Sequence, residues 1–449
     1  MAFSIWTMAP FVVLLAGIAL LPMIPATAKA WERNTVKLAL ALGLGLPTAI
    51  GVWLVGGSHL VTHSMLEYIQ FIALLASLFV VTGGIHLAGD IEATPRHNTI
   101  VLALGAVLAS FIGTTGAAML LARPLLNINR QREYRSHTMV FMIFIVANCG
   151  GLLTPLGDPP LYVGLMRGVP FSWTFSLFGP WLFVNALLLL TYYALERREH
   201  ARESAFALAW DQQQKVPLRL HGGSNIVWLG VIIASVALLG DHLWLKVGVQ
   251  LAVAAASYLL TNKQLRFVDN DFTWRPIIEV AVLFVGIFLT MIPALEFLRV
   301  HAWAMPLNQY TFFGFTGTLS AVLDNTPTYL AFFDMAGALT LPGPTVAGVP
   351  ELYLTAISLG AVTCGAITYI GNGPNFMIKA VAEERSVQMP SFGRYVVWAL
   401  EFLVPVLVAL VCLFISQLTL VRIVGAAIVA VVVALDLRLI LRHRRPVAP

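Results

Sequence analysis

The chain has 449 residues, of which 59% are hydrophobic and 11% are charged, and its mean hydropathy is +0.83. This composition excludes a soluble globular domain and predicts an all-α polytopic membrane protein. The formal net charge of +5 encodes orientation in the membrane, so it gives no reason to expect nucleic acid as a partner.

Apolar stretches of roughly 20 residues, long enough to cross a bilayer as a helix, follow one another along the chain. The first half predicts spans near 8–28, 36–56 and 66–88, a helix pair near 99–127, and spans near 138–168 and 174–195. The second half predicts spans near 224–240, 243–261 and 276–295, a helix pair near 309–338, and spans near 352–381, 395–418 and 420–440. A polar segment, 196–223, is interpreted as a cytoplasmic linker between a first repeat, 1–195, and a second repeat, 224–449.

Two short motifs echo each other, and both interrupt an apolar stretch. Residues 154–160 (TPLGDPP) and 368–374 (TYIGNGP) share the pattern Thr-x-x-Gly-[Asp/Asn]-x-Pro. Ahead of them lies a second matched pair, Ser110-x-x-x-Thr114-Thr115 and Ser320-x-x-x-Asp324-Asn325. Because glycine and proline break helices, 138–168 and 352–381 are predicted to be broken helices. Broken helices at matching places in two halves indicate the binding site of a transporter.

Clusters of Lys and Arg predict how the chain is oriented. They lie at 29–37, at 130–135, in the linker and at the C-terminal end. All of them are cytoplasmic if the pair 99–127 is a re-entrant hairpin from the cytoplasmic side and the pair 309–338 is one from outside. The sequence therefore predicts two inverted-topology repeats in a multi-pass protein of the bacterial inner membrane, with the N-terminus outside and the C-terminus cytoplasmic.

The hairpin tips and helix breaks supply oxygen-bearing groups at the depth of the bilayer. Broken backbone survives there only where it lines a cavity or is buried in protein, so these groups are expected to meet. Oxygen ligands suit hard cations such as sodium. The predicted ion-binding residues are Thr114, Thr115, Asn148, Thr154, Gly157, Asp158, Asp324, Asn325, Thr326, Thr368, Gly371 and Asn372, with Asp324 and Asn325 as sodium ligands.

Two carboxylates carry the functional hypothesis. An ionisable group at bilayer depth is costly, and one carboxyl can hold either a proton or a sodium ion, as Asp324 and Asp158 would. The alternatives are a turn or helix cap for Asp324 and a cap before Pro159 and Pro160 for Asp158. Four other carboxylates lie near predicted span ends, where solvation is the ordinary explanation and a proton relay remains open for the first and last: Glu279, Glu296, Asp334 and Glu401.

These motifs resemble those of the ion transporter superfamily, and within it the NhaD-type sodium/proton antiporters, which are related to arsenite-permease and citrate-transporter-like proteins. The stretches that carry the resemblance are 147–160, 320–327 and 365–376. The resemblance implies a scaffold, a mobile transport domain with elevator-like motion, a homodimer, and a cation site lined by Asp324 and Asn325. The tips Gly113-Thr114-Thr115 and Asp324-Asn325-Thr326 replace the Ser-Asn-Thr triplets of the sodium/dicarboxylate branch, which favours the antiporter branch.

The expected function is exchange of cytoplasmic sodium, or lithium, for periplasmic protons. The alternative is transport of an anion or oxyanion such as citrate or arsenite, held at the N-termini of half-helices. Gly-x-Ser-x-Gly, His-Glu-x-x-His and P-loop motifs are missing from the sequence, so no enzymatic activity is expected. The expected partners are a small inorganic ion, the lipid bilayer and a second copy of the chain, with no cofactor beyond sodium and protons.

Overall fold

The structure is a computed structural model that describes residues 3–22, 24–31, 33–213, 215–239, 242–304, 306–323, 325–339 and 343–442. Nine helices in these ranges are long and apolar enough to cross a membrane. Strands in the same ranges form two antiparallel two-stranded pairs. The predicted all-α polytopic membrane protein is therefore confirmed. Asp324, one of the two carboxylates singled out above, lies outside the described residues.

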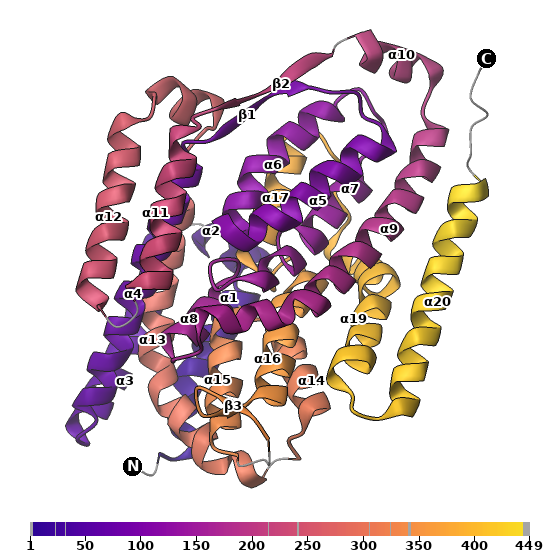
Figure 1. The fold of residues 1–449 in the computed structure, drawn as a ribbon. Helices are drawn as coiled ribbons and strands as arrows, with labels where there is room; N and C mark the ends of the chain where they lie inside the picture. The colour runs from indigo at the N-terminus through magenta and orange to yellow at the C-terminus, as the bar shows by residue number, and fades with distance from the viewer. Residues whose placement is uncertain are drawn as a thin grey trace.

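One group of long helices forms an outer bundle, on the left of Figure 1. It contains α3 (Asn34–Leu54), α4 (Ser58–Thr82), α11 (Ser224–Leu238), α12 (Leu243–Leu260) and α13 (Arg275–His301). α13 packs along α3 and α4, and the short α1 (Ala9–Leu20) packs against α3 and α13, while α2 (Pro25–Trp31) packs against α3. Both halves of the chain therefore contribute helices to this bundle.

The helices next to the two breaks occupy the centre of the molecule. They are α5 (Pro95–Ile112), α6 (Thr114–Ile128), α7 (Ser136–Ile145) and α8 (Pro159–Met166) from the first half, and α14 (Gln309–Ser320), α15 (Asn325–Gly337), α16 (Glu351–Cys364) and α17 (Gly373–Glu384) from the second. Figure 1 shows α5 and α6 in the upper part and α14 and α15 in the lower part. α8 packs against α15 and α17 packs against α6, so each half-helix beyond a break contacts the hairpin of the other half.

Local sequence explains where the two hairpins begin and where the first one turns. Thr94 caps α5 by accepting a hydrogen bond from the His97 N–H at 3.1 Å, with Pro95 at the first helical position. Gly113 then separates α5 from α6 with a φ of 81°, a conformation that side chains disfavour. On the other side, Asn308 forms a capping box with Thr311 at the start of α14.

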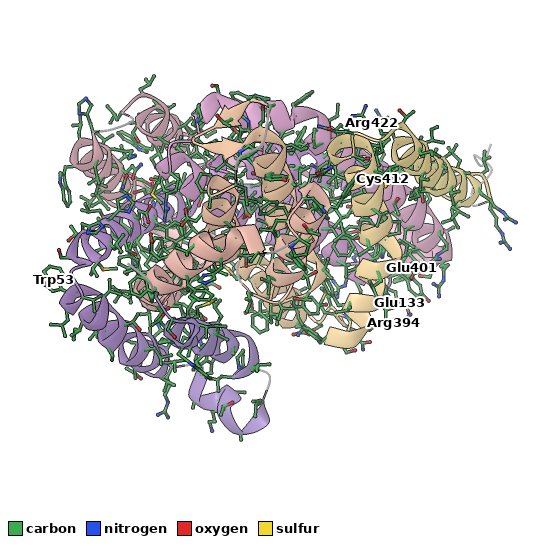
Figure 2. All side chains as sticks on the ribbon, turned by 90° about the horizontal axis from the view of Figure 1, so that it is seen from below. Trp53, Glu133, Arg394, Glu401, Cys412 and Arg422 are labelled. Carbon is green, nitrogen blue, oxygen red and sulfur yellow. The ribbon has the colours of Figure 1, made fainter. Side chains whose placement is uncertain are left out.

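A third group of helices covers the opposite side. α9 (Phe178–Arg202) packs against α5 and α7, and α20 (Thr419–Arg442) packs against α9 and α19 (Val404–Leu410). α18 (Phe392–Trp398) and α19 are joined by a π-helical turn at Ala399–Leu403. Figure 2 shows Trp53 of α3 at the left edge of the molecule and Arg422 of α20 toward its upper right.

The segment 196–223, interpreted above as a linker, contains regular secondary structure. α9 continues to Arg202, α10 spans Ala205–Gln213, and β2 (Val216–His221) pairs with β1 (His86–Asp90). The register places Leu87 opposite Leu220. The strand was missed because its partner lies more than a hundred residues away, and pairing of this kind leaves no local signature. The remaining strands, β3 (Thr345–Val346) and β4 (Val349–Pro350), form a tight hairpin.

Candidate functional site

The two helix breaks have the same backbone course. α7 ends at Ile145, a 3-10 turn follows at Cys149–Leu153, and α8 begins at Pro159. α16 ends at Cys364, a 3-10 turn follows at Gly365–Ile367, and α17 begins at Gly373. The equivalent threonines, Thr154 (φ −136°, ψ 159°) and Thr368 (φ −130°, ψ 164°), are both extended. The two motifs thus share a backbone conformation as well as a sequence pattern.

A pair of glycines allows each break to fold back on itself. A Cβ atom at Gly157 would lie 2.1 Å from the carbonyl oxygen of Gly151, and one at Gly371 would lie 2.5 Å from that of Gly365. Distances this short leave no room for a side chain. The glycine of the shared motif is therefore required by the close approach of two backbone segments in both halves.

The threonine of each motif ties the break to the neighbouring hairpin. The Thr154 hydroxyl donates to the carbonyl oxygen of Ser110, and the Thr368 hydroxyl donates to that of Ala321 at 2.5 Å. The hairpin serines form hydrogen bonds in the opposite direction. Ser110 donates to the carbonyl oxygen of Gly150 at 2.5 Å, and Ser320 donates to that of Ala361 at 2.7 Å. These bonds give hydrogen-bond partners to carbonyl groups in the hairpins and beside the breaks, and so fix each break to its hairpin.

Asp158 lies where the two halves meet. Its side chain accepts hydrogen bonds from the Thr114 hydroxyl at 3.0 Å, the Asn325 amide at 2.9 Å and the Asn372 amide at 3.5 Å. Thr114 and Asn325 begin the second helices of the two hairpins, and Asn372 precedes α17. The residue is only 1% exposed. One buried carboxylate therefore joins both hairpin tips and both breaks.

A cluster of asparagine side chains adjoins this carboxylate. Asn372 also donates to the carbonyl oxygen of Ala147 at 3.0 Å and to the Asn148 side-chain oxygen at 3.2 Å. The Asn148 amide donates to the side-chain oxygen of Asn375 at 2.7 Å. The Asn375 amide in turn bonds the carbonyl oxygens of Gly365 and Thr368. Asn375 was not singled out from the sequence, although its position one residue after the motif proline could have drawn attention to it.

The other predicted residues lie in the same region. Thr326 is buried in the first turn of α15, and Thr115 is half-buried in the first turn of α6. The backbone carbonyl of Gly157 accepts a hydrogen bond from the Thr114 N–H at 2.8 Å. Asp158 does occupy the N-cap position of α8, but its side chain makes no capping bond and turns to Thr114 and Asn325 instead. The capping role considered for Asp158 is thus wrong.

Helix termini add a favourable field for a negative charge. Four helices, α6, α8, α15 and α17, begin at or directly after the residues that meet at Asp158. The N-terminus of a helix carries a partial positive charge and free N–H groups. The three side chains that donate to Asp158 are neutral. Hydrogen bonds and helix ends together offset the cost of burying this carboxylate.

Two carboxylates expected to be solvated form ion pairs within the protein. Glu279 of α13 accepts a hydrogen bond at 2.5 Å from Lys37 of α3, whose side chain is 4% exposed. Asp334 of α15 pairs at 2.9 Å with Arg167, which follows α8. Burial of Lys37 explains the first pair, in which Glu279 stays 39% exposed, and partial burial of both partners explains the second, because a charge removed from water needs a partner.

Comparison with known proteins identifies a family. A family model described as "Putative citrate transport" matches residues 1–415, which include both hairpins and both breaks. No curated protein matches the chain significantly. Since the match covers most of the chain, the protein belongs to this citrate-transport family.

Proposed function

We propose that the protein exchanges sodium, or lithium, for protons, and that Asp158 is a titratable ion ligand. The family match and the membrane helices make the protein a secondary transporter; the identity of the ions is the proposed part. The observation that carries the proposal is the buried Asp158 carboxylate, which bonds the tips of both hairpins. A carboxyl group in this position can bind a proton or a sodium ion but not both, and such competition couples the two ions.

The groups around Asp158 suit this exchange. The amides of Asn325 and Asn372 now donate to the carboxylate. An amide that rotates by half a turn presents its oxygen, so the same side chains can ligate a cation. The hydroxyl of Thr114 and the carbonyl oxygens freed at the breaks are further oxygen ligands, and Asp324 precedes Asn325 in the chain.

Movement is proposed to occur between the central helices and the outer bundle, in an elevator-like manner within a homodimer. The polar contacts that support this division lie at its boundary. Arg167, which follows α8, pairs with Glu67 of α4 in the outer bundle and with Asp334 of the central α15. Ion pairs at such a boundary can break and re-form, whereas the interlocked hydrogen bonds around Asp158 hold the central helices together.

Citrate transport is the second candidate, and the family description favours it. The four helix N-termini at the site are suited to carboxylate groups. A citrate ion beside Asp158 would face a like charge, however, and would require an accompanying cation or a protonated Asp158. The geometry therefore favours a cation as the primary substrate.

Proteoliposomes with an imposed proton gradient test the proposal. Sodium added to the wild-type protein should collapse the gradient, and Asp158→Asn should lose at least about 90% of this activity because an amide cannot exchange a proton. Asp436→Asn is the matched control, since Asp436 is also buried but bonds Thr191 at 2.8 Å, away from the site. Size-exclusion profiles verify folding of both variants.

The same vesicles separate the two candidates. Uptake of radiolabelled citrate without sodium-dependent proton movement would replace antiport by citrate transport. If Asp158→Asn folds and exchanges sodium for protons as fast as the wild type, Asp158 is not the coupling residue.

A further inference from the structure

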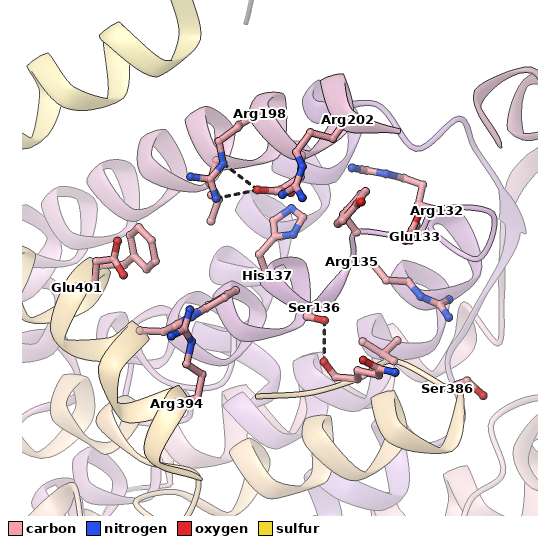
Figure 3. A pocket seen from close by; sticks show the side chains of 17 residues that line it. Arg132, Glu133, Arg135, Ser136, His137, Arg198, Arg202, Ser386, Arg394 and Glu401 are labelled. Carbon is pink, nitrogen blue, oxygen red and sulfur yellow. Dashed lines mark hydrogen bonds and ion pairs between the residues drawn. The ribbon is translucent and has the colours of Figure 1, made fainter. Parts of the chain in front are cut away.

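A large cavity lies away from the site around Asp158. Its volume is about 770 Å³, and Figure 3 shows it between the start of α7, the end of α9, α18 and the turn after α17. The turn is fixed to α7, since the Ser136 hydroxyl donates to the Gln388 carbonyl oxygen at 2.8 Å. Five arginines and three glutamates line the cavity: Arg132, Arg135, Arg198, Arg202, Arg394, Glu133, Glu199 and Glu401.

The inner wall of the cavity contains a buried arginine with an unsatisfied donor. Arg132 pairs with Glu196 and Glu203, and its side chain is 1% exposed. His137 also pairs with Glu196, so the acidic groups behind the wall are already engaged. The Nη2 group of Arg132 is buried and has no hydrogen-bond partner among the residues that the structure describes. A buried N–H group of this kind leaves the positive charge of Arg132 incompletely compensated beside the cavity.

Along the rim of the cavity, there are more arginines than carboxylates paired with them. Arg198 and Arg202 share the single carboxylate of Glu199, each at 2.7 Å. Arg135 donates to the Arg385 carbonyl oxygen at 3.3 Å. Arg394 is exposed and makes no ion pair with any residue that the structure describes. Figure 3 shows Arg394 across the cavity from Arg198 and Arg202.

We propose that this cavity binds a small anion of the phosphate type, either free in solution or as the headgroup of an anionic lipid. Guanidinium groups offer paired N–H donors that match the oxygens of phosphate, and several of them point into one space here. Glu133 and Glu401 also line the cavity but are exposed, and repulsion from an exposed carboxylate is weakened where solvent and salt reach it.

The position of the cavity gives binding a structural consequence. Its lining comes from α7 and the turn after α17 on one side and from α9 and α18 on the other. A bound phosphate group would connect these two sets of elements through Arg132 or Arg135 on one side and Arg198 or Arg394 on the other. Binding is thus expected to stabilise the folded protein, independently of which ion the site around Asp158 carries.

Binding measurements on the full-length protein in nanodiscs test the proposal. With phosphatidylcholine alone, calorimetry should detect inorganic pyrophosphate if the ligand is a free anion. With added phosphatidylglycerol, native mass spectrometry should detect retained lipid if the ligand is a headgroup. Arg198→Gln combined with Arg394→Gln should weaken whichever binding is found by about tenfold or more, because charge-assisted hydrogen bonds are lost.

Arg438→Gln on α20 is the matched control, because it removes an exposed arginine that does not line the cavity. It should leave the affinity unchanged. Absence of both pyrophosphate and lipid binding would overturn the proposal. So would an equal loss of affinity in the control and the double variant, since that would reveal non-specific attraction to surface charge. The replaced arginines of the double variant lie at the rim, and thermal melting verifies that it folds.

Discussion

The carboxylate of Asp158 shows how an acidic side chain can be accommodated inside the protein. It is 1% exposed, and removing such a group from water costs several kcal/mol unless it is compensated. Compensation comes from Thr114, Asn325 and Asn372, which belong to different helices. The carboxylate therefore gains its three hydrogen bonds only when the central helices have packed together.

A substitution at the second break tests the close backbone approach. Gly371→Ala should destabilise the protein by about 3 kcal/mol, at the upper end of the usual cost of overpacking. The added Cβ would lie 2.5 Å from the Gly365 carbonyl oxygen and 2.7 Å from that of Ser320. Thermal melting in detergent measures the loss.

Gly373→Ala provides the control two residues along the chain, because a Cβ there meets nothing within 4 Å. It should change stability by less than about 0.5 kcal/mol. Equal melting temperatures for the two variants would show that the backbone at Gly371 is not confined as described.

At the scale of elements, a three-residue ion cluster joins the outer bundle to the central helices. Arg167, at the end of α8, donates to Glu67 of α4 at 2.7 Å and to Asp334 of α15 at 2.9 Å. The Glu67 side chain is 4% exposed and that of Asp334 16%. Because each acid comes from a different helix, the arginine determines how α4, α8 and α15 approach one another.

Glu67→Gln should weaken this junction by about 2 kcal/mol, since it removes one charge from a largely buried pair. Glu383→Gln, which affects the exposed pair with Lys379 on α17, should cost less than about 0.5 kcal/mol. Chemical denaturation of both variants gives the comparison. A cost for Glu67→Gln no greater than that of the surface control would contradict a structural role for the cluster.

For the whole molecule, the arrangement of the polar ends defines two membrane faces. Figure 1 shows α10 and the β1–β2 pair at one end and β3 at the other. The positive clusters of the 196–223 segment predict that the first end is cytoplasmic. The hairpins α5–α6 and α14–α15 lie toward opposite ends, as two inverted repeats require, although the inversion itself stays a prediction.

Cysteine labelling tests this orientation. Cys149, Cys364 and Cys412 are all buried, so the wild-type protein should react weakly with a membrane-impermeant maleimide. Ala205→Cys on α10 should be labelled in everted vesicles, and Thr345→Cys on β3 in intact spheroplasts, because both positions are exposed. Labelling of both positions from the same side would refute the two-faced arrangement.

Local signals account for what could be predicted from the sequence. Long apolar runs predict helices, and the paired Gly and Pro motifs predict breaks, so the expected hairpin 99–127 corresponds closely to α5 and α6. The same echo led to Asp158, Asn325 and Asn372. Contacts between distant segments were not predictable: Asn148 bonds Asn375, 227 residues away, and Arg167 bonds Glu67, 100 residues away. Glu67 does not stand out in the sequence, and Asn375 is marked only by its place after the motif proline, because both contacts arise only once the chain has folded.

The outermost helix, α20, is apolar almost all round and has only two buried residues among those described, Gly425 and Asp436. Hydrophobicity alone would allow such a helix to face the lipid with any of its sides. Asp436 removes that freedom, because its bond to Thr191 of α9 is lost if the helix spins and a carboxylate then faces hydrocarbon, at a cost of order 1–3 kcal/mol. A single acidic residue thus fixes the rotation of this helix about its own axis. It thereby also determines which side of the helix faces the surrounding lipid.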